Sequence, residues 1–218
     1  MIIAIDGPAA AGKGTLGKAL AKAYKLAYLD TGALYRAVAV AVLDAGASPK
    51  DETAVVKIAE TLDPGYTQHQ DLRTEATGNV ASITSAYPGV RTALLALQQD
   101  FADNPGPEFN GAILDGRDIG TVVCPDADLK LFITASAEAR AKRRHKEEVA
   151  SAGQTALGYA EILADVKARD DRDTNRAIAP MIPADDAHLI DTTDLSIEAA
   201  FSRASTLVTT LIEAKSKR

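Results

Sequence analysis

The sequence predicts an α/β fold, a doubly wound sheet of five parallel strands with helices on both faces. Apolar runs typical of strands buried on both faces recur at residues 2–5, 26–29, 112–115, 129–134 and 187–191. Segments with helical periodicity separate them, and this alternation places ligands at the carboxyl ends of the strands. The chain has 218 residues, 46% of them hydrophobic, which is enough for one domain with a sizeable core.

Apolar spacing and capping signals place the helices. The first helix begins near Lys13 and carries Leu16, Leu20 and Ala23 on one face. Asp51 is a predicted N-cap, because its side chain can accept a hydrogen bond from a free N–H group of the first turn. The other helices are predicted at residues 33–43, 51–62, 75–86, 90–103 and 196–214.

Two helical regions interrupt the alternation, one before the third strand and one, rich in charge, after the fourth. We predict a single domain over residues 1–218. Its parts are a core at approximately 1–43, 105–135 and 180–218, an insertion at approximately 44–104 and a lid at approximately 136–179.

Composition and charge argue against several functional classes. The formal net charge is −6 and only 5% of residues are aromatic, which is unfavourable for binding nucleic acid or an anionic membrane. The single cysteine, Cys124, cannot build a disulfide framework and is predicted to be buried, in keeping with a cytoplasmic location. The N-terminus lacks the basic start of a signal peptide, and the apolar run at 37–43 is too short to cross a bilayer.

The segment GPAAAGKGT lies between the first strand and the first helix. Successive backbone N–H groups of such a loop surround an anion, and the helix N-terminus adds partial positive charge. Lys13 is expected to reach the β- and γ-phosphates of a nucleoside triphosphate. This predicted phosphate loop consists of Gly7, Pro8, Ala9, Ala10, Ala11, Gly12, Lys13, Gly14 and Thr15.

Position 14 departs from the common pattern, in which Ser or Thr follows the lysine directly. Gly14 stands there and Thr15 comes one residue later. This form resembles the loop of nucleoside monophosphate kinases. The resemblance implies that Thr15 supports the phosphates and contacts Mg²⁺ through water.

Polar residues follow the second strand in the segment YLDTGALYR. Asp30 and Thr31 lie at the carboxyl end of the strand, and Tyr35 and Arg36 come one turn into the next helix, where a guanidinium can bind a phosphate. An N-capping strand end followed by a surface arginine explains the same residues equally well. The residues alone leave both interpretations open.

The segment ILDGRDIG places Asp115, Arg117 and Asp118 at the carboxyl end of the third strand. Two acids around one base can hold a ribose or a base edge and orient a metal-bound phosphate. A self-paired charged turn is the alternative, but the position at the ligand-binding edge of the sheet favours a site.

Arginines replace an apolar stripe within residues 158–176. The stripe consists of Tyr159, Ile162, Leu163 and Val166. If the helix continues, the same face carries Arg169, Arg172 and Arg176, with Asp170, Asp171 and Asp173 between them to hold the guanidinium groups. A salt-bridged surface helix does not explain why arginines take over this face. A phosphoryl-transfer site does, because cations stabilise the charge of its transition state.

Together these motifs resemble the bacterial cytidylate kinases. The resemblance rests on GPAAAGKGT, DTGALYR, NVAS with PGVR, DGRDIGTVV and RDDRDTNRAIAP, which extend from residue 7 to residue 180. It implies a P-loop enzyme that transfers the γ-phosphoryl group of ATP to CMP or dCMP with Mg²⁺ and without a protein nucleophile. We expect a cytoplasmic monomer that binds neither nucleic acid nor membranes.

Residue roles follow from the resemblance alone. Catalysis is assigned to Lys13, Arg169, Arg172 and Arg176, and Asp30 joins Thr15 as a candidate Mg²⁺ ligand. The phosphate loop, together with Arg140 and Arg144, is assigned to ATP binding. One of the three arginines Arg140, Arg143 and Arg144 is expected to pack on the adenine. CMP is assigned to Thr31, Tyr35, Arg36, Ser82, Arg91, Asp115, Arg117, Asp118, Arg169 and Arg176, with Ser82 and Arg91 reading the cytosine edge. The insertion would hold the monophosphate, and the lid would exclude water.

One departure and three alternatives accompany this interpretation. Many bacterial members carry a small β-sheet insert where LDPGYTQHQDLRTEATGNVAS is too short for three strands. The nearest alternative is a P-loop kinase for UMP, AMP or a metabolite hydroxyl. A GTPase-like switch would need N/T-K-x-D where the chain has DTTDLS, and a nucleic-acid binder using RAKRRHK conflicts with the net charge.

Overall fold

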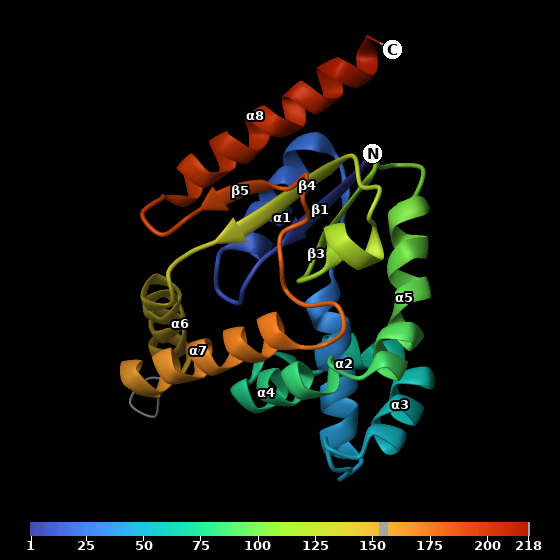
Figure 1. Ribbon diagram of the computed structural model, residues 1–218, viewed down its shortest axis with the longest axis vertical. Coiled ribbons are helices and arrows are strands. Elements are labelled where there is room, and N and C mark those ends of the chain that lie inside the picture. The colour runs from blue at the N-terminus through green and yellow to red at the C-terminus, as the bar shows by residue number, and fades with distance from the viewer. Residues whose placement is uncertain (153–156, 218) are drawn as a thin grey trace.

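A computed structural model describes residues 1–152 and 157–217, and one parallel sheet forms its centre (Figure 1). The strand order is β2-β3-β1-β4-β5. The strands are β1 (Ile2–Asp6), β2 (Ala27–Asp30), β3 (Ala112–Asp115), β4 (Leu129–Thr134) and β5 (His188–Asp191). Each predicted strand is correct to within one residue at either end, and the predicted α/β class is confirmed.

The helices alternate with the strands as predicted. They are α1 (Lys13–Tyr24), α2 (Thr31–Asp44), α3 (Glu52–Glu60), α4 (Glu75–Thr84), α5 (Pro88–Asp103), α6 (Ala137–Ala152), α7 (Tyr159–Asn175) and α8 (Ile197–Ser216). The Asp51 side chain accepts a hydrogen bond from Ala54 N and caps α3, which confirms that prediction. Helix α5 begins two residues earlier than predicted because proline suits the first position of a helix, where no N–H donor is needed.

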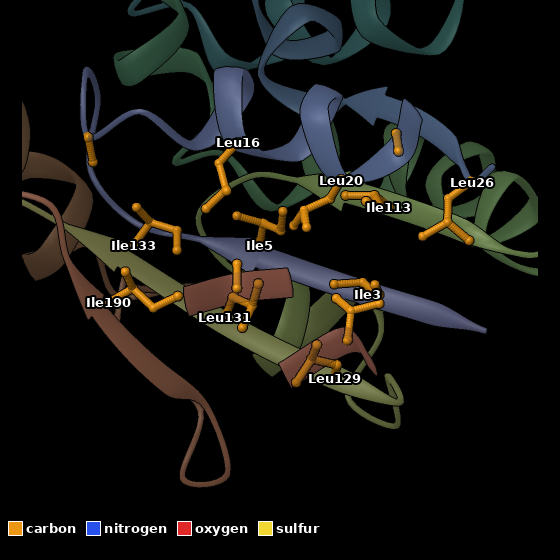
Figure 2. Close-up of a cluster of buried hydrophobic side chains, with 14 residues drawn as sticks. Ile3, Ile5, Leu16, Leu20, Leu26, Ile113, Leu129, Leu131, Ile133 and Ile190 are labelled. Carbon is orange, nitrogen blue, oxygen red and sulfur yellow. The ribbon is translucent and has the colours of Figure 1, made fainter. Parts of the chain in front are cut away.

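The main core lies between the sheet and two helices, α1 and α8, that cover one of its faces. Figure 2 shows Leu16 and Leu20 of α1 beside Ile5 of β1. Helix α5 and a π-helical turn, η3 (Ile119–Val123), pack on the opposite face and bury Cys124, as predicted. Packing on both faces fixes the carboxyl edge of the sheet as a rigid base.

The region between β2 and β3 is helical. Helices α2, α3 and α5 share a second core that includes Val38, Val55 and Val90. Two short 3₁₀ helices, η1 (Pro64–Gln68) and η2 (Gln70–Arg73), connect α3 to α4. Residues 44–104 are all described and none of them is in a strand, so the predicted absence of a β-sheet insert is confirmed.

The second excursion consists of α6 and α7, which pack on each other through Ala141, Ile162 and Val166. Figure 1 shows the pair at the end of the sheet toward which β4 points. No helix in the described part of the chain is long and apolar enough to cross a membrane.

The predicted continuous face of three arginines is wrong in one respect. Helix α7 ends at Asn175, and Arg176 has an extended conformation beyond it. The chain turns back at this point, since Met181 N donates to Asp173 O at 2.8 Å and Arg176 Nε donates to Ala179 O. Arg176 therefore reaches the site from a loop and not from the helix face.

Candidate active site

The phosphate loop has the backbone path that an anion-binding loop needs. Gly7 and Gly12 have φ values of 137° and 92°, which favour glycine, and a side chain at Gly7 would collide with the backbone of Ile133. Lys13 follows directly at the start of α1 and is buried. Its ammonium donates to Pro8 O at 3.0 Å, so the lysine folds back over its own loop.

The electrostatic environment of Lys13 is strongly perturbed. Burial and the nearby cation Arg117 lower the pKa of Lys13 to about 8, although Asp115, 3.8 Å from its ammonium, favours the charged form. Burial also raises the pKa of Asp115, whose Oδ2 accepts a hydrogen bond from the Tyr28 hydroxyl at 2.9 Å. Perturbed pKa values of this kind cluster at functional sites.

The phosphate loop opens onto a cavity of about 620 Å³. That volume lies in the range of small-molecule sites and is sufficient for a nucleoside triphosphate. Thr15 and Asp30, the candidate metal ligands, both line this donor cavity. Asp30 also caps α2 through Ala33 N and pairs with Arg73 at 2.7 Å.

A second cavity, of about 50 Å³, lies between α4, α7 and the loop after β3. Most of the residues predicted to bind the acceptor line it: Thr31, Tyr35, Ser82, Arg91, Arg117, Asp118, Arg169 and Arg176. The structure thus brings together side chains from five separate segments of the chain. We call this the acceptor cavity.

Two predicted acceptor residues, Asp115 and Arg36, are absent from the lining of this cavity, although the charge of Arg36 still acts on Arg169. Asp115 is not part of the lining and stands beside Lys13 on the donor side, because it occupies the end of β3 next to β1. Arg36 donates to Leu72 O and Thr74 O and so holds η2 in place. Burial and neighbouring Arg73 lower the pKa of Arg36 to about 10.

Asp173 lines the acceptor cavity; the sequence predicted it only as an acid that holds the neighbouring arginines, and its contact with Arg169 confirms that role. Its carboxylate lies 3.3 Å from Arg117 Nε and 3.8 Å from Arg169 Nε, and accepts a hydrogen bond from Ser82 Oγ at 3.0 Å. Burial raises its pKa, but these cations outweigh that effect and hold the pKa below the usual value. Helical periodicity could have placed Asp173 at the cavity, since it lies seven residues after Val166 and therefore on the same helix face.

The other two aspartates of the run do not hold the predicted arginines. Asp170 pairs with Arg140, and Asp171 accepts a hydrogen bond from Asn175. Asp118 instead pairs with Arg91 and lies 3.7 Å from Arg176 Nη2. The acids that balance the arginines thus come from two separate segments.

Two arginines at the acceptor cavity keep unused donors. Arg169 Nε and Arg176 Nη2 are buried and make no hydrogen bond with any described residue. Burial and Arg117 lower the pKa of Arg169 to about 9, which reflects several cations gathered at one point. A group of buried guanidinium donors favours an anionic ligand such as a phosphate.

The lid arginines have different surroundings from those predicted. Arg140 is buried and donates to Ala135 O, to Ala9 O and to Asp170, so it does not line the donor cavity. Arg144 does not line that cavity either, whereas Arg143 does and donates to Thr192. Thr192, which follows β5 and donates to Ala11 O, was a second missed residue.

Comparison with known proteins identifies the family. The family model described as cytidylate kinase matches residues 3–210. A cytidylate kinase from Azorhizobium caulinodans is 54% identical over 208 residues, which is 95% of this chain and 98% of that protein. One from Rhodopseudomonas palustris is 53% identical over 208 residues, 95% of each chain.

A solved structure shares the fold alone. Shikimate kinase from Bacteroides thetaiotaomicron superposes with a TM-score of 0.50 at 14% identity, covering 96% of this chain and 98% of its own. The family match spans nearly the whole chain, and the relatives match it over nearly their full lengths. This chain therefore belongs to the cytidylate kinase family.

Proposed function

We propose that this protein transfers the γ-phosphoryl group of ATP to CMP, and also to dCMP, giving ADP and CDP or dCDP. Family membership supports the reaction. The observation that carries the proposal is the position of the buried arginine cluster, which lies with the phosphate loop at the carboxyl edge of one sheet. Donor and acceptor phosphates would meet between them.

The donor cavity is the proposed ATP site. The backbone N–H groups of the phosphate loop would surround the phosphates. Lys13 would exchange its hydrogen bond to Pro8 O for the β- and γ-phosphates, whose charge raises its lowered pKa and keeps it protonated. Arg143 and Thr192 line the same cavity and are further proposed contacts of ATP.

Mg²⁺ fits the residues at this cavity. Mg²⁺ prefers oxygen ligands and commonly uses one or two side chains together with phosphates and water. The Thr15 hydroxyl and the Asp30 carboxylate supply such oxygens, and no group of three or more candidate metal-binding side chains occurs in the described residues. When bound, the ion would neutralise charge on the phosphates.

The acceptor cavity is the proposed CMP site. Arg169 and Arg176 would bind phosphate oxygens through the donors that make no hydrogen bond in the described residues. Arg117 lines the same cavity, and Arg172 donates to Ser82 at its edge. Ser82, Arg91 and Asp118 would read the cytosine, and Thr31 and Tyr35 would complete the lining. We add Asp173, a hydrogen-bond acceptor for Ser82, to this set.

The transfer needs no protein nucleophile. A phosphate oxygen of CMP attacks the γ-phosphorus of ATP, and the bond from that phosphorus to the β–γ bridging oxygen breaks as ADP leaves. Lys13 and the arginines stabilise the charge that spreads over the transferring group. The lid at approximately 136–179 and the insertion at approximately 44–104 would close around both nucleotides and exclude water.

We propose a monomer that acts in the cytoplasm. Both cavities are lined by residues of one chain, so no second copy is needed to complete the site. The single buried Cys124 is compatible with a reducing compartment.

Steady-state kinetics with Mg²⁺ and ATP test the reaction. We expect kcat/KM for CMP and dCMP to exceed that for UMP and AMP, because the acceptor cavity offers paired charged groups to a base edge. A preference for AMP or UMP would replace this proposal with a kinase for that nucleotide.

A further inference from the structure

A buried carboxylate, Asp6, lies at the end of β1 directly before the phosphate loop. Its two oxygens accept hydrogen bonds from the backbone N–H groups of Ile119, at 2.7 Å, and Gly120, at 2.8 Å. These two residues begin the π-helical turn η3, whose N-cap residue, Asp118, makes no side-chain capping bond. Asp6 therefore caps a turn that belongs to a different strand connection.

The capped turn begins at an acceptor residue. Asp118 precedes Ile119, and its carboxylate pairs with Arg91 and lies 3.7 Å from Arg176 Nη2. The Asp6 carboxylate thus fixes the peptide group that follows Asp118, while the Asp6 backbone leads into the loop for the donor. Asp6 thus connects the two halves of the site, one through its side chain and the other through its backbone.

The surroundings of Asp6 make its charge costly. Burial raises the pKa of Asp6 to about 6. The two N–H donors and Lys13 favour the charged form, but they only partly offset the effect of burial. Asp118 and Cys124 also face it, and the Lys130 stem packs against Gly120 beside its Oδ2. Because the folded-state pKa lies above the ordinary value, this group lowers stability as the pH rises toward 7. Because ionisation of Asp6 lowers the stability of the fold near pH 7, a carboxylate at this position calls for a reason other than stability.

We propose that Asp6 is a positioning residue that couples the phosphate loop to acceptor binding by holding Asp118, and hence Arg91 and Arg176, in place. The proposal rests on the CMP kinase activity proposed above. Asp6 itself touches neither nucleotide. Its removal should weaken CMP binding more than ATP binding.

The variant Asp6→Asn tests this role, with Asp128→Asn as a matched control. Asp128 also accepts a backbone hydrogen bond on β1, from Ile2 N at 2.8 Å, but at the opposite end of the strand. We expect Asp6→Asn to raise KM for CMP about tenfold, the loss expected for one charge-assisted hydrogen bond, with KM for ATP changed less than about twofold. Asp128→Asn should change neither. Equal effects on both substrates, or equal behaviour of the two variants, would overturn the proposal.

A double-mutant cycle separates positioning from a structural role. In an Asp118→Asn background, Asp6→Asn should raise KM for CMP little further, because the group it positions is already gone. Additive effects would show that Asp6 acts independently of Asp118. If Asp6→Asn does not fold, Gly120→Ala replaces it, because a Cβ at Gly120 would lie 3.4 Å from Asp6 Oδ2 and 3.0 Å from the Lys130 stem.

The pH dependence supplies an independent readout. The ratio of KM for CMP between Asp6→Asn and the wild type should narrow as the pH falls from 7.5 to 5.5, because wild-type Asp6 gains a proton near pH 6. The phosphate of CMP also titrates near pH 6, but this contribution is common to both proteins and cancels in the ratio. A constant ratio contradicts the proposal. A wild type that does not phosphorylate CMP contradicts the proposed function instead.

Discussion

Ser82 shows how one small side chain can serve two partners. Its hydroxyl donates to Asp173 and accepts a hydrogen bond from Arg172 Nε at 3.2 Å, both on α7. The same hydroxyl is the proposed reader of the cytosine edge. In the structure it connects α4 to α7, so CMP bound at the proposed site would compete with α7 for this group.

Replacement of Ser82 tests its role in base recognition. We expect Ser82→Ala to reduce the preference for CMP over UMP about fivefold, since a net hydrogen bond contributes about 1 kcal/mol. The kcat/KM values for the two nucleotides measure this preference, and KM for ATP serves as the internal control. An unchanged preference would remove Ser82 from base recognition and leave the kinase activity unaffected as a proposal.

For individual residues, the sequence correctly indicated which side chains at the strand ends belong to the site, but it did not indicate which side chains contact one another. Lys13, Arg117 and Asp118 were found because each follows a recognisable strand. Asp115 was assigned to the acceptor because the resemblance to cytidylate kinases groups it with Asp118, whereas strand pairing with β1 puts it beside Lys13. Pairing between distant strands is a tertiary property that spacing along the chain does not contain.

Among the elements, α6 is tied to the rest of the site through Arg140. Its guanidinium connects α6 to Asp170 of α7 and to Ala9 O of the phosphate loop. The side chain is buried, which means that its loss leaves Asp170 and two carbonyl groups without their cationic partner. We therefore assign Arg140 a role in holding the lid elements together.

Truncation of Arg140 should cost stability. We expect Arg140→Ala to lower the free energy of unfolding by about 3 kcal/mol, as for other broken buried ion pairs. Lys142→Ala, an exposed neighbour on the same helix, should change it by less than about 0.5 kcal/mol. Urea denaturation measures both. Equal stability of the two variants, with a raised KM for ATP only in Arg140→Ala, would favour the original assignment of Arg140 to ATP binding.

Element boundaries were predictable where local signals exist. Asp51 marks the start of α3 because its side chain caps that helix. The end of α7 was not predictable from periodicity, because it depends on the chain folding back so that Met181 bonds to Asp173 O. The helices η1 and η2 have no periodicity of their own, since 3₁₀ segments of four or five residues are too short to show one.

The molecule as a whole is closed at the acceptor side. The acceptor cavity, of about 50 Å³, is smaller than the several hundred cubic ångströms of ordinary ligand sites, so we expect α4 and α7 to separate when CMP binds at the proposed site. Hydrogen bonds between these helices, such as that from Arg172 to Asn79 at 3.3 Å, oppose the separation. The donor cavity remains large in the same structure.

Weakening this contact should speed CMP binding. We expect Asn79→Ala to increase the association rate of CMP about threefold, because a hydrogen bond lost from the closed state contributes about 0.5–1 kcal/mol. Lys167→Ala is the control, since it breaks the Lys167–Glu138 pair inside the lid, 3.1 Å in length, and leaves the α4–α7 contact intact. Stopped-flow measurements compare the two. A slower or unchanged rate in Asn79→Ala would mean that this hydrogen bond does not limit entry.

The hydrogen bond between Ser82 and Asp173 would weaken the binding of a nucleotide with the wrong base. A ligand that enters must replace the bonds that the protein makes with itself, and a base unable to satisfy Ser82 recovers less of that cost. Asp173 would thus compete with the base for the Ser82 hydroxyl. Discrimination would arise from the difference between the Ser82–Asp173 hydrogen bond and the hydrogen bond that each base can make to Ser82. Fidelity would then depend on the strength of the contacts between α4 and α7 as much as on the fit of CMP.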